Sequence, residues 1–373
     1  MHLSALAVTD FRNWPAAELW LVTGPTVLVG ANGQGKTNLV EAVYYLATLC
    51  SHRSPIDAPL VRSGAPRAVI RGVVVSDARE LRIEVEINPG RPNRAQLNGA
   101  PVARPREILG GLRAVLFAPE DLAIVRGDPS ERRRFLDELL VARVPRLAAV
   151  RADYERVLKQ RGALLKSAGG LRHAGDLRTL DVWDGHLART GAELLTARLA
   201  ALTALRPHAV AAYAQVAPAA PPLTLEYVSS LRAGLPAAPT EPLLEAALLA
   251  ELARVRLQEL ERGVNLVGPH RDDLALSLGG LPLRGYASHG EAWSTTVALR
   301  LACYELLCDE GPEPVLVLDD VFAELDVSRR DQLAAVAGKA EQAIITAAVW
   351  SDIPDQLQAT RIDVRDGVLQ RVP

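Results

Sequence analysis

The sequence predicts an α/β fold in which mixed sheets surround a P-loop and a mainly helical second domain is inserted. Three features lead to this prediction. A glycine-rich run lies between a strand and a helix near the N-terminus, the middle of the chain has helical periodicity, and an apolar strand near the C-terminus ends in two acids. The flanking parts would then form one nucleotide-binding lobe around the insert.

The run Gly-Ala-Asn-Gly-Gln-Gly-Lys-Thr at residues 30–37 matches the pattern G-x-x-x-x-G-K-[ST]. An apolar strand-type segment, 26–29, precedes it, and helical spacing follows over 38–48. Glycines let backbone N–H groups ring a phosphate at a helix N-terminus. A glycine-rich turn before an ordinary helix is the alternative, which the fixed pattern positions and their context disfavour. The residues expected to bind a nucleoside triphosphate here are Gly30, Asn32, Gly33, Gly35, Lys36 and Thr37.

The second half of the site is expected where the apolar strand 314–318 ends in Asp319 and Asp320. Asp319 would hold Mg²⁺ through water together with the Thr37 hydroxyl, and Asp320 would act on the attacking water. With Lys36 reaching the β- and γ-phosphates, these two acids are the expected catalytic residues.

The chain between these motifs changes from strand to helical periodicity. The alternation over 81–87 and the turn Asn98-Gly99 predict strands in the first part. The predicted elements of the middle part are a helix from 129 to 165 with a break at Pro145, helices over 186–216 and 241–262, and a strand at 224–229. We expect an ATP-binding lobe of residues 1–118 plus 312–373 and a helical arm of residues 119–311.

Composition excludes several classes of protein. The chain is 49% hydrophobic and 23% charged, as in soluble globular proteins. No segment has the apolar length of a membrane span, and no basic region with an apolar core opens the chain, so we expect a cytoplasmic protein. The three cysteines form no disulfide framework or metal cluster pattern. The net charge of −2 means that any DNA contact must come from a local basic patch.

Further segments carry a resemblance to a known family. Residues 321–326 look like the D-loop of ABC-type ATPases, and residues 287–291 look like a reduced ABC signature with Ser288 and Gly290. Segments 11–13, 127–137 and 267–274 resemble the RecF family of bacterial recombination mediators, relatives of the SMC head domains. The resemblance covers nearly the whole chain and implies an ABC/SMC-type ATPase head.

This resemblance implies a function in DNA replication, recombinational repair and the SOS response. Ser288 and Gly290 would contact the γ-phosphate held by a second copy, so that two ATP molecules close a homodimer, and Arg12 would contribute to the nucleotide site. The family would bind duplex DNA near single-strand gaps, act as a weak DNA-dependent ATPase, and promote RecA loading with RecR and RecO.

The sequence also departs from ABC patterns. Transport enzymes place Glu where this chain has Asp320, and the shorter carboxylate suggests slow hydrolysis fit for a switch. No histidine follows the strand 343–348, and no glutamine lies in 117–121, so the sequence does not identify the residue that senses the γ-phosphate.

Ser51–Ser54 could approach the base or ribose. His270 beside Asp272 could suggest a metal site, but with no third ligand type a structural histidine is favoured.

Two segments are candidates for DNA contact. Residues 126–161 hold ten basic and six acidic side chains, and residues 91–113 hold five arginines and one acid. Arg132, Arg133 and Arg134 form the best cluster, although one helix would point them to different faces. The alternative to DNA contact is that these side chains lie on solvent-exposed helix faces and form i,i+4 ion pairs.

Three other functions fit the sequence less well. A transporter ATPase subunit would carry a glutamine loop, a switch histidine and a short helical insert. An architectural SMC-like protein would have long heptad coiled coils, whereas this arm is interrupted at Pro145. A small-molecule kinase would not explain the Ser288-x-Gly290 element.

Overall fold

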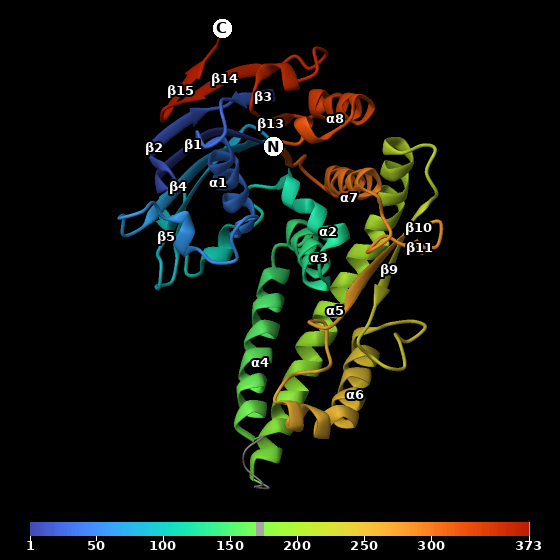
Figure 1. Ribbon diagram of the computed structural model, residues 1–373. Helices are drawn as coiled ribbons and strands as arrows, with labels where there is room; N and C mark the ends of the chain where they lie inside the picture. The colour runs from blue at the N-terminus through green and yellow to red at the C-terminus, as the bar shows by residue number, and fades with distance from the viewer. Residues whose placement is uncertain (169–174, 373) are drawn as a thin grey trace. The chain divides into compact units, whose positions relative to one another are not determined.

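The computed structural model describes residues 1–168 and 175–372, which divide into two compact units (Figure 1). Unit 1 comprises residues 1–122, 208–220 and 288–373. Unit 2 comprises residues 123–207 and 221–287. Each unit has its own sheets and helices and is described by itself.

Unit 1 is built on two six-stranded sheets. The first is antiparallel throughout, with the order β2 (Trp14–Trp20), β1 (His2–Phe11), β4 (Ala68–Ser76), β5 (Arg79–Ile87), β6 (Arg94–Leu97) and β7 (Ala100–Pro101). The second has the order β15 (Val368–Arg371), β14 (Thr360–Arg365), β3 (Gly24–Val29), β13 (Gln342–Ala347), β12 (Val315–Asp319) and β8 (Ala114–Phe117). All of its strands are parallel except β15. The predicted turn at Asn98-Gly99 joins β6 to β7, with positive φ at both residues.

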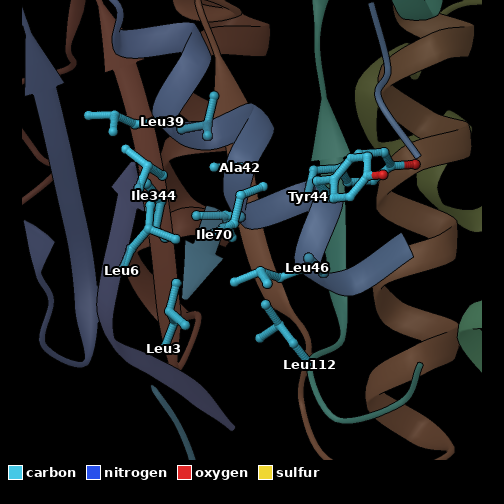
Figure 2. Packing of buried hydrophobic residues seen from close by; sticks show 14 of the residues in the cluster. Leu3, Leu6, Leu39, Ala42, Tyr44, Leu46, Ile70, Leu112 and Ile344 are labelled. Atoms are coloured by element: carbon cyan, nitrogen blue, oxygen red, sulfur yellow. The ribbon is translucent and has the colours of Figure 1, made fainter. Parts of the chain in front are cut away.

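Helix α1 (Lys36–Thr48) is the centre of the unit 1 core. It contacts β1, β4 and β5 of the first sheet and β8, β12 and β13 of the second. A helix that is apolar nearly all round must be buried on all sides. Figure 2 shows the resulting cluster, which includes Leu3, Leu6 and Ile70 from the first sheet, Leu39, Ala42 and Leu46 from α1, and Ile344 from β13. The start of α1 is therefore held between both sheets.

Two long helices complete unit 1, α7 (His289–Asp309) and α8 (Val327–Lys339). Helix α7 packs beside β8, and α8 packs beside β3 and β13. The sequence placed α7 at the end of the arm, but its contacts put it in unit 1. The reason is physical: residues 292–304 of α7 are buried, and a parallel sheet needs helical cover on its faces.

Unit 2 consists mainly of helices. They are α2 (Leu122–Arg126), which starts at the unit boundary, α3 (Pro129–Arg143), α4 (Leu147–Ala168), α5 (Gly175–Val216), whose last turns belong to unit 1, and α6 (Glu241–Arg262). A three-stranded sheet has the order β11 (Leu281–Pro282), β10 (Asp273–Leu278) and β9 (Leu223–Val228). The predicted break at Pro145 lies between α3 and α4. Within the described ranges, no helix is long and apolar enough to cross a membrane.

A buried ion-pair network joins the three long helices of unit 2. The Arg161 side chain on α4 is completely buried, and its Nε donates to Asp184 Oδ1 on α5 at 2.6 Å. Its two Nη atoms donate to Glu259 Oε2 on α6 at 2.6 Å and to Asn265 Oδ1 at 2.7 Å. Helix α5 begins at Gly175, before the predicted residue 186, and Asp184 in this earlier part pairs with Arg161 and Arg256.

We expect Arg161→Ala to lower the free energy of unfolding by about 3–5 kcal/mol, because it leaves the buried Glu259 carboxylate without its ion pair and Asp184 with Arg256 alone. Urea denaturation followed by circular dichroism measures the effect. Arg156→Ala is the matched control on α4, since Arg156 pairs with Asp153 at the surface. Equal midpoints for the two variants would contradict this role of the network.

Candidate nucleotide-binding site

The P-loop connects β3 to α1, and two of its glycines are required by close backbone approach. A Cβ added at Gly30 would lie 2.2 Å from the Val364 carbonyl oxygen on β14. Gly35 has φ +99°, and an added Cβ there would lie 2.6 Å from both Asn13 Oδ1 and Trp14 Nε1. The Trp14 indole donates to the Gly35 carbonyl oxygen at 3.0 Å. The loop is thus held by β14 on one side and by the β1–β2 turn on the other.

The Lys36 ammonium lies within the loop at the start of α1. Its Nζ donates to the carbonyl oxygens of Gly30 at 2.7 Å and Ala31 at 3.2 Å. Asn32 and Gly33 are exposed at the loop surface, and Gly33 has φ +86°. The loop therefore combines a cation, a helix N-terminus and exposed backbone, which together suit a polyphosphate.

The two predicted halves of the site meet in the structure. Thr37 Oγ1 donates to Asp319 Oδ1 at 3.0 Å, although 282 residues separate them. Thr346 Oγ1 on β13 donates to the same carboxylate oxygen at 2.6 Å and accepts from the Asp320 N–H at 2.9 Å. Asp320 has φ +53°, a left-handed conformation that is uncommon outside glycine. Thr346 thus fixes both acids.

Thr346 was not predicted as a site residue. The available signal was one hydroxyl in the apolar strand 342–347, beside the strand that carries Asp319. Buried hydroxyls require a partner, so such a residue is a candidate for holding an adjacent acid.

Burial raises the pKa of the Asp319 carboxyl to about 6. Hydrogen bonds from Thr346 and Thr37 oppose this rise, and the negative charges of Asp320 and Glu120 add to it. Glu120 follows β8, which pairs with β12, and it lies in the segment 117–121, which contains no glutamine. Burial and the nearby negative charges disfavour the ionised form of Asp319, so a cation bound beside this carboxylate would stabilise it.

The segment after α1 also reaches the acidic strand end. His52 Nε2 lies 3.9 Å from Asp319 Oδ2, and the His52 ring packs edge-on against Tyr44. Of residues 51–54, which the sequence places near the base or ribose, His52 lies beside the Asp319 carboxylate, whereas Ser51 and Arg53 contact Glu41 and Asn38.

Arg12 is engaged with a buried glutamate of α1. Its Nε and Nη2 donate to the two carboxylate oxygens of Glu41 at 2.7 and 2.5 Å, and its Nη1 donates to the Pro59 carbonyl oxygen at 3.0 Å. Burial acts to raise the pKa of Glu41, but hydrogen bonds from Arg12 and Ser51 bring it below its ordinary value. The Arg12 guanidinium therefore connects α1 to the segment that follows it, through Glu41 and the Pro59 carbonyl oxygen.

Ser288 and Gly290 lie at the N-terminus of α7. Ser288 Oγ accepts from the Glu291 N–H at 3.2 Å, and Glu291 Oε2 accepts from the Ser288 N–H at 2.8 Å, which is a capping box. A Cβ added at Gly290 would lie 3.7 Å from the Arg329 guanidinium, which donates to Asp326 at 2.8 Å. The signature-like turn and the end of the D-loop-like segment are therefore neighbours within unit 1.

The prediction of a DNA-binding arginine cluster on α3 is wrong for Arg132. Its side chain is only 4% exposed and makes a two-pronged pair with the Asp273 carboxylate at 2.7 and 2.9 Å. Arg133 donates to the Asp272 carbonyl oxygen at 2.8 Å, and Arg134 donates to Glu138 at 2.8 Å. Arg132 thus joins α3 to β10 and Arg133 reaches the residue before β10, whereas Arg134 forms an i,i+4 pair within α3.

His270 is a structural histidine, as the sequence favoured. Its Nδ1 forms a 2.7 Å hydrogen bond with the Tyr154 hydroxyl, and burial lowers the pKa of the imidazole to about 4. Among the residues that the structure covers, no cluster of three or more His, Cys, Asp or Glu side chains has a geometry that could hold a metal ion.

A P-loop, an acidic strand end and a signature-like helix N-terminus on this fold define an ATPase head of the SMC type. The sequence model of the RecF/RecN/SMC N-terminal domain family matches residues 2–360. Over its full length the chain is 59% identical to the DNA replication and repair protein RecF of Frankia alni and 58% identical to that of Streptomyces avermitilis, with 100% of each chain covered. The chain belongs to the RecF family.

Solved structures agree with this assignment. The recombination mediator protein RecF of the RecFOR pathway, in its RecF-ATPrS and RecF-ATP structures, superposes with a TM-score of 0.90 in both cases. The identities are 28% and 29%, over 100% of this chain and 98% and 97% of those chains. The Smc head domain of Pyrococcus furiosus superposes with a TM-score of 0.54 at 17% identity, over 100% of this chain and 96% of that one, which shows a shared fold.

The raised pKa of Asp319 predicts a pH-dependent stability. The protonated form is favoured in the folded state, so this contribution to stability is present in acid and is lost as the pH rises through about 6. In EDTA and without nucleotide, we expect Asp319→Asn to be about 3 kcal/mol more stable than the parent at pH 8, with the difference shrinking toward pH 4.

Urea midpoints across this pH range test the prediction. The same substitution at the exposed Asp355 is the control and should leave the profile unchanged. Parallel profiles for Asp319→Asn and the parent protein would show that the Asp319 charge is not the source of the effect.

Proposed function

We propose that this protein is an ATP-dependent DNA-binding protein of replication and recombinational repair, acting in the cytoplasm. Two copies would close over duplex DNA near single-strand gaps and promote RecA loading together with RecR and RecO. The 3.0 Å contact between Thr37 and Asp319 carries the proposal, because it joins the two halves of a phosphate site. The family of its relatives, which are DNA replication and repair proteins, supports the biological setting.

The proposed ATP site uses the residues of unit 1 in distinct ways. The α1 N-terminus and the Lys36 ammonium bind the β- and γ-phosphates. The Thr37 hydroxyl and the Asp319 carboxylate are hard oxygen donors 3.0 Å apart, a donor pair that fits Mg²⁺. Mg²⁺, when bound, neutralises charge on the phosphates. Asp320, held by Thr346, orients the attacking water.

The proposed dimer depends on the α7 N-terminus of each copy. Ser288 and Gly290 would meet the γ-phosphate bound by the other copy, so ATP would bind the closed dimer better than the open one and shift the equilibrium toward closure. Hydrolysis would remove this link. The short carboxylate of Asp320 supports slow hydrolysis, so ATP turnover serves as an off-switch. In this proposal unit 1 is the ATP-binding lobe and unit 2 is the arm.

The first test is DNA binding with and without a working P-loop. Fluorescence anisotropy with gapped and intact duplexes should show tighter binding with ATP than with ADP. Lys36→Met removes a charge-assisted contact worth about 2 kcal/mol, so ATP affinity should fall roughly 30-fold and the gain in DNA affinity should disappear. Lys339→Met, an exposed lysine at the end of α8, is the control.

If DNA affinity is the same with ATP and with ADP, the proposal that ATP controls DNA binding is contradicted. Equal affinity for gapped and intact duplexes would contradict the gap preference but not the ATP dependence of DNA binding.

The second test addresses the dimer. Ser288→Arg should abolish the ATP-dependent dimer in sedimentation velocity, because a bulky cation would occupy the surface that meets the second copy. Glu291→Ala breaks the same capping box and is the matched control, since both variants lose a cap worth about 1 kcal/mol but only the first blocks the surface. Loss of the dimer in both variants, or in neither, would count against the assigned role of Ser288.

A further inference from the structure

A hollow of about 740 Å³ lies in unit 1 where β5 turns into β6. Its lining includes three arginines, Arg67, Arg91 and Arg94, with Glu86 as the acid. The remaining lining residues are Asn88 and three prolines. The lining is thus rich in guanidinium groups and contains no large aliphatic or aromatic side chain.

The charges of this hollow are not balanced. Arg67 pairs with Glu86 at 2.7 Å. Arg91 and Arg94 are exposed, and within residues 1–168 and 175–372 no ion pair is found for either of them. The hollow therefore presents three guanidinium groups against one carboxylate.

A neighbouring hollow on the same sheet offers a contrast. It measures about 510 Å³, and its arginines Arg71 and Arg82 face Glu84 at 2.5 Å and Glu80 at 3.9 Å. Two cations are matched there by two acids. Positive charge therefore exceeds negative charge in the β5–β6 hollow but not in this neighbouring hollow.

The turn that carries Arg91 is held in shape by its own hydrogen bonds. The Asn88 N–H donates to Asn93 Oδ1 at 2.9 Å, and Asn88 Nδ2 donates to Glu86 Oε1 at 3.1 Å. Pro89 and Pro92 restrict the backbone further. A preformed turn loses little conformational freedom when it binds a ligand.

The same turn is fastened to the P-loop helix. Asn93 Nδ2 donates to Asp57 Oδ2 at 2.6 Å and to the Tyr45 hydroxyl at 3.1 Å, and this hydroxyl donates to Asp57 Oδ1 at 3.1 Å. Tyr45 is buried on α1, the helix that begins with Lys36. The basic hollow and the nucleotide loop are therefore attached to one rigid helix.

We propose that the β5–β6 hollow binds phosphates of the DNA backbone through Arg91 and Arg94, an inference that rests on the DNA-binding function proposed above. Guanidinium groups pair with phosphate in two-pronged geometry. The energetic centres of protein-docking surfaces are enriched in tryptophan and tyrosine beside arginine, and this lining has neither aromatic residue. Contacts to phosphates carry no sequence information, so binding here is independent of sequence. Of the two basic segments, the one at 91–113 is assigned to DNA.

The test is the salt dependence of duplex affinity, measured by anisotropy with ATP between about 50 and 200 mM salt. Each phosphate contact contributes about 0.9 to the slope of log affinity against log salt. We expect the Arg91→Ala/Arg94→Ala double variant to lower the slope by about 2. The Arg71→Ala/Arg82→Ala pair removes equal charge from the neutral hollow and should leave the slope unchanged. Glu86→Gln releases Arg67 and should tighten binding.

The outcomes separate this inference from the proposed function. If the parent protein binds no duplex with either nucleotide, the proposed DNA-binding function fails. If the parent binds and the Arg91/Arg94 variant keeps its slope, or if Glu86→Gln leaves affinity unchanged, only the hollow is overturned. A variant that keeps DNA affinity but loses binding of an acidic protein would mark a protein-docking surface and also overturn the proposal. ATP affinity and melting temperature should match the parent in all variants.

Discussion

The candidate site in unit 1 is organised around one buried carboxylate, Asp319, and the hydroxyls that donate to it. Thr37 reaches it from the helix between the sheets, and Thr346 reaches it from the adjacent strand. A charge in this position is costly unless its hydrogen bonds are satisfied or a cation is present. The hydrophobic cluster around α1 packs against both sheets, so burial and hydrogen bonding together position Thr37 and Asp319 at the proposed phosphate site.

In unit 2, buried charged side chains join helices to one another and to a strand. Its long helices are joined by Arg161 and its carboxylate partners, and α3 is fastened to β10 by Arg132. Buried pairs of this kind add little net stability compared with apolar packing, but they penalise any other register of the helices. Arg132 and Arg161, which lie in one of the two basic segments, make buried ion pairs inside unit 2.

Several elements could be predicted from sequence because their signals are local. The P-loop follows from a fixed pattern between strand and helix, and the strand ending in Asp319 and Asp320 follows from an apolar run closed by acids. The break at Pro145 follows from proline chemistry. The start of α5 lies before the predicted residue 186, in a part of the helix where Asp184 pairs with arginines of α4 and α6 that are distant in sequence.

The sequence by itself determined the class of fold, the nucleotide loop and the family, since each depends on residue types at fixed spacing. Only the tertiary structure decided which charges are free to act. It paired Arg132 and Arg12 internally, placed Thr346 and His52 beside Asp319, and left Arg91 and Arg94 exposed at a rigid turn. The physical reason is that burial and pairing of a charge depend on neighbours far away in the chain, which no local pattern encodes.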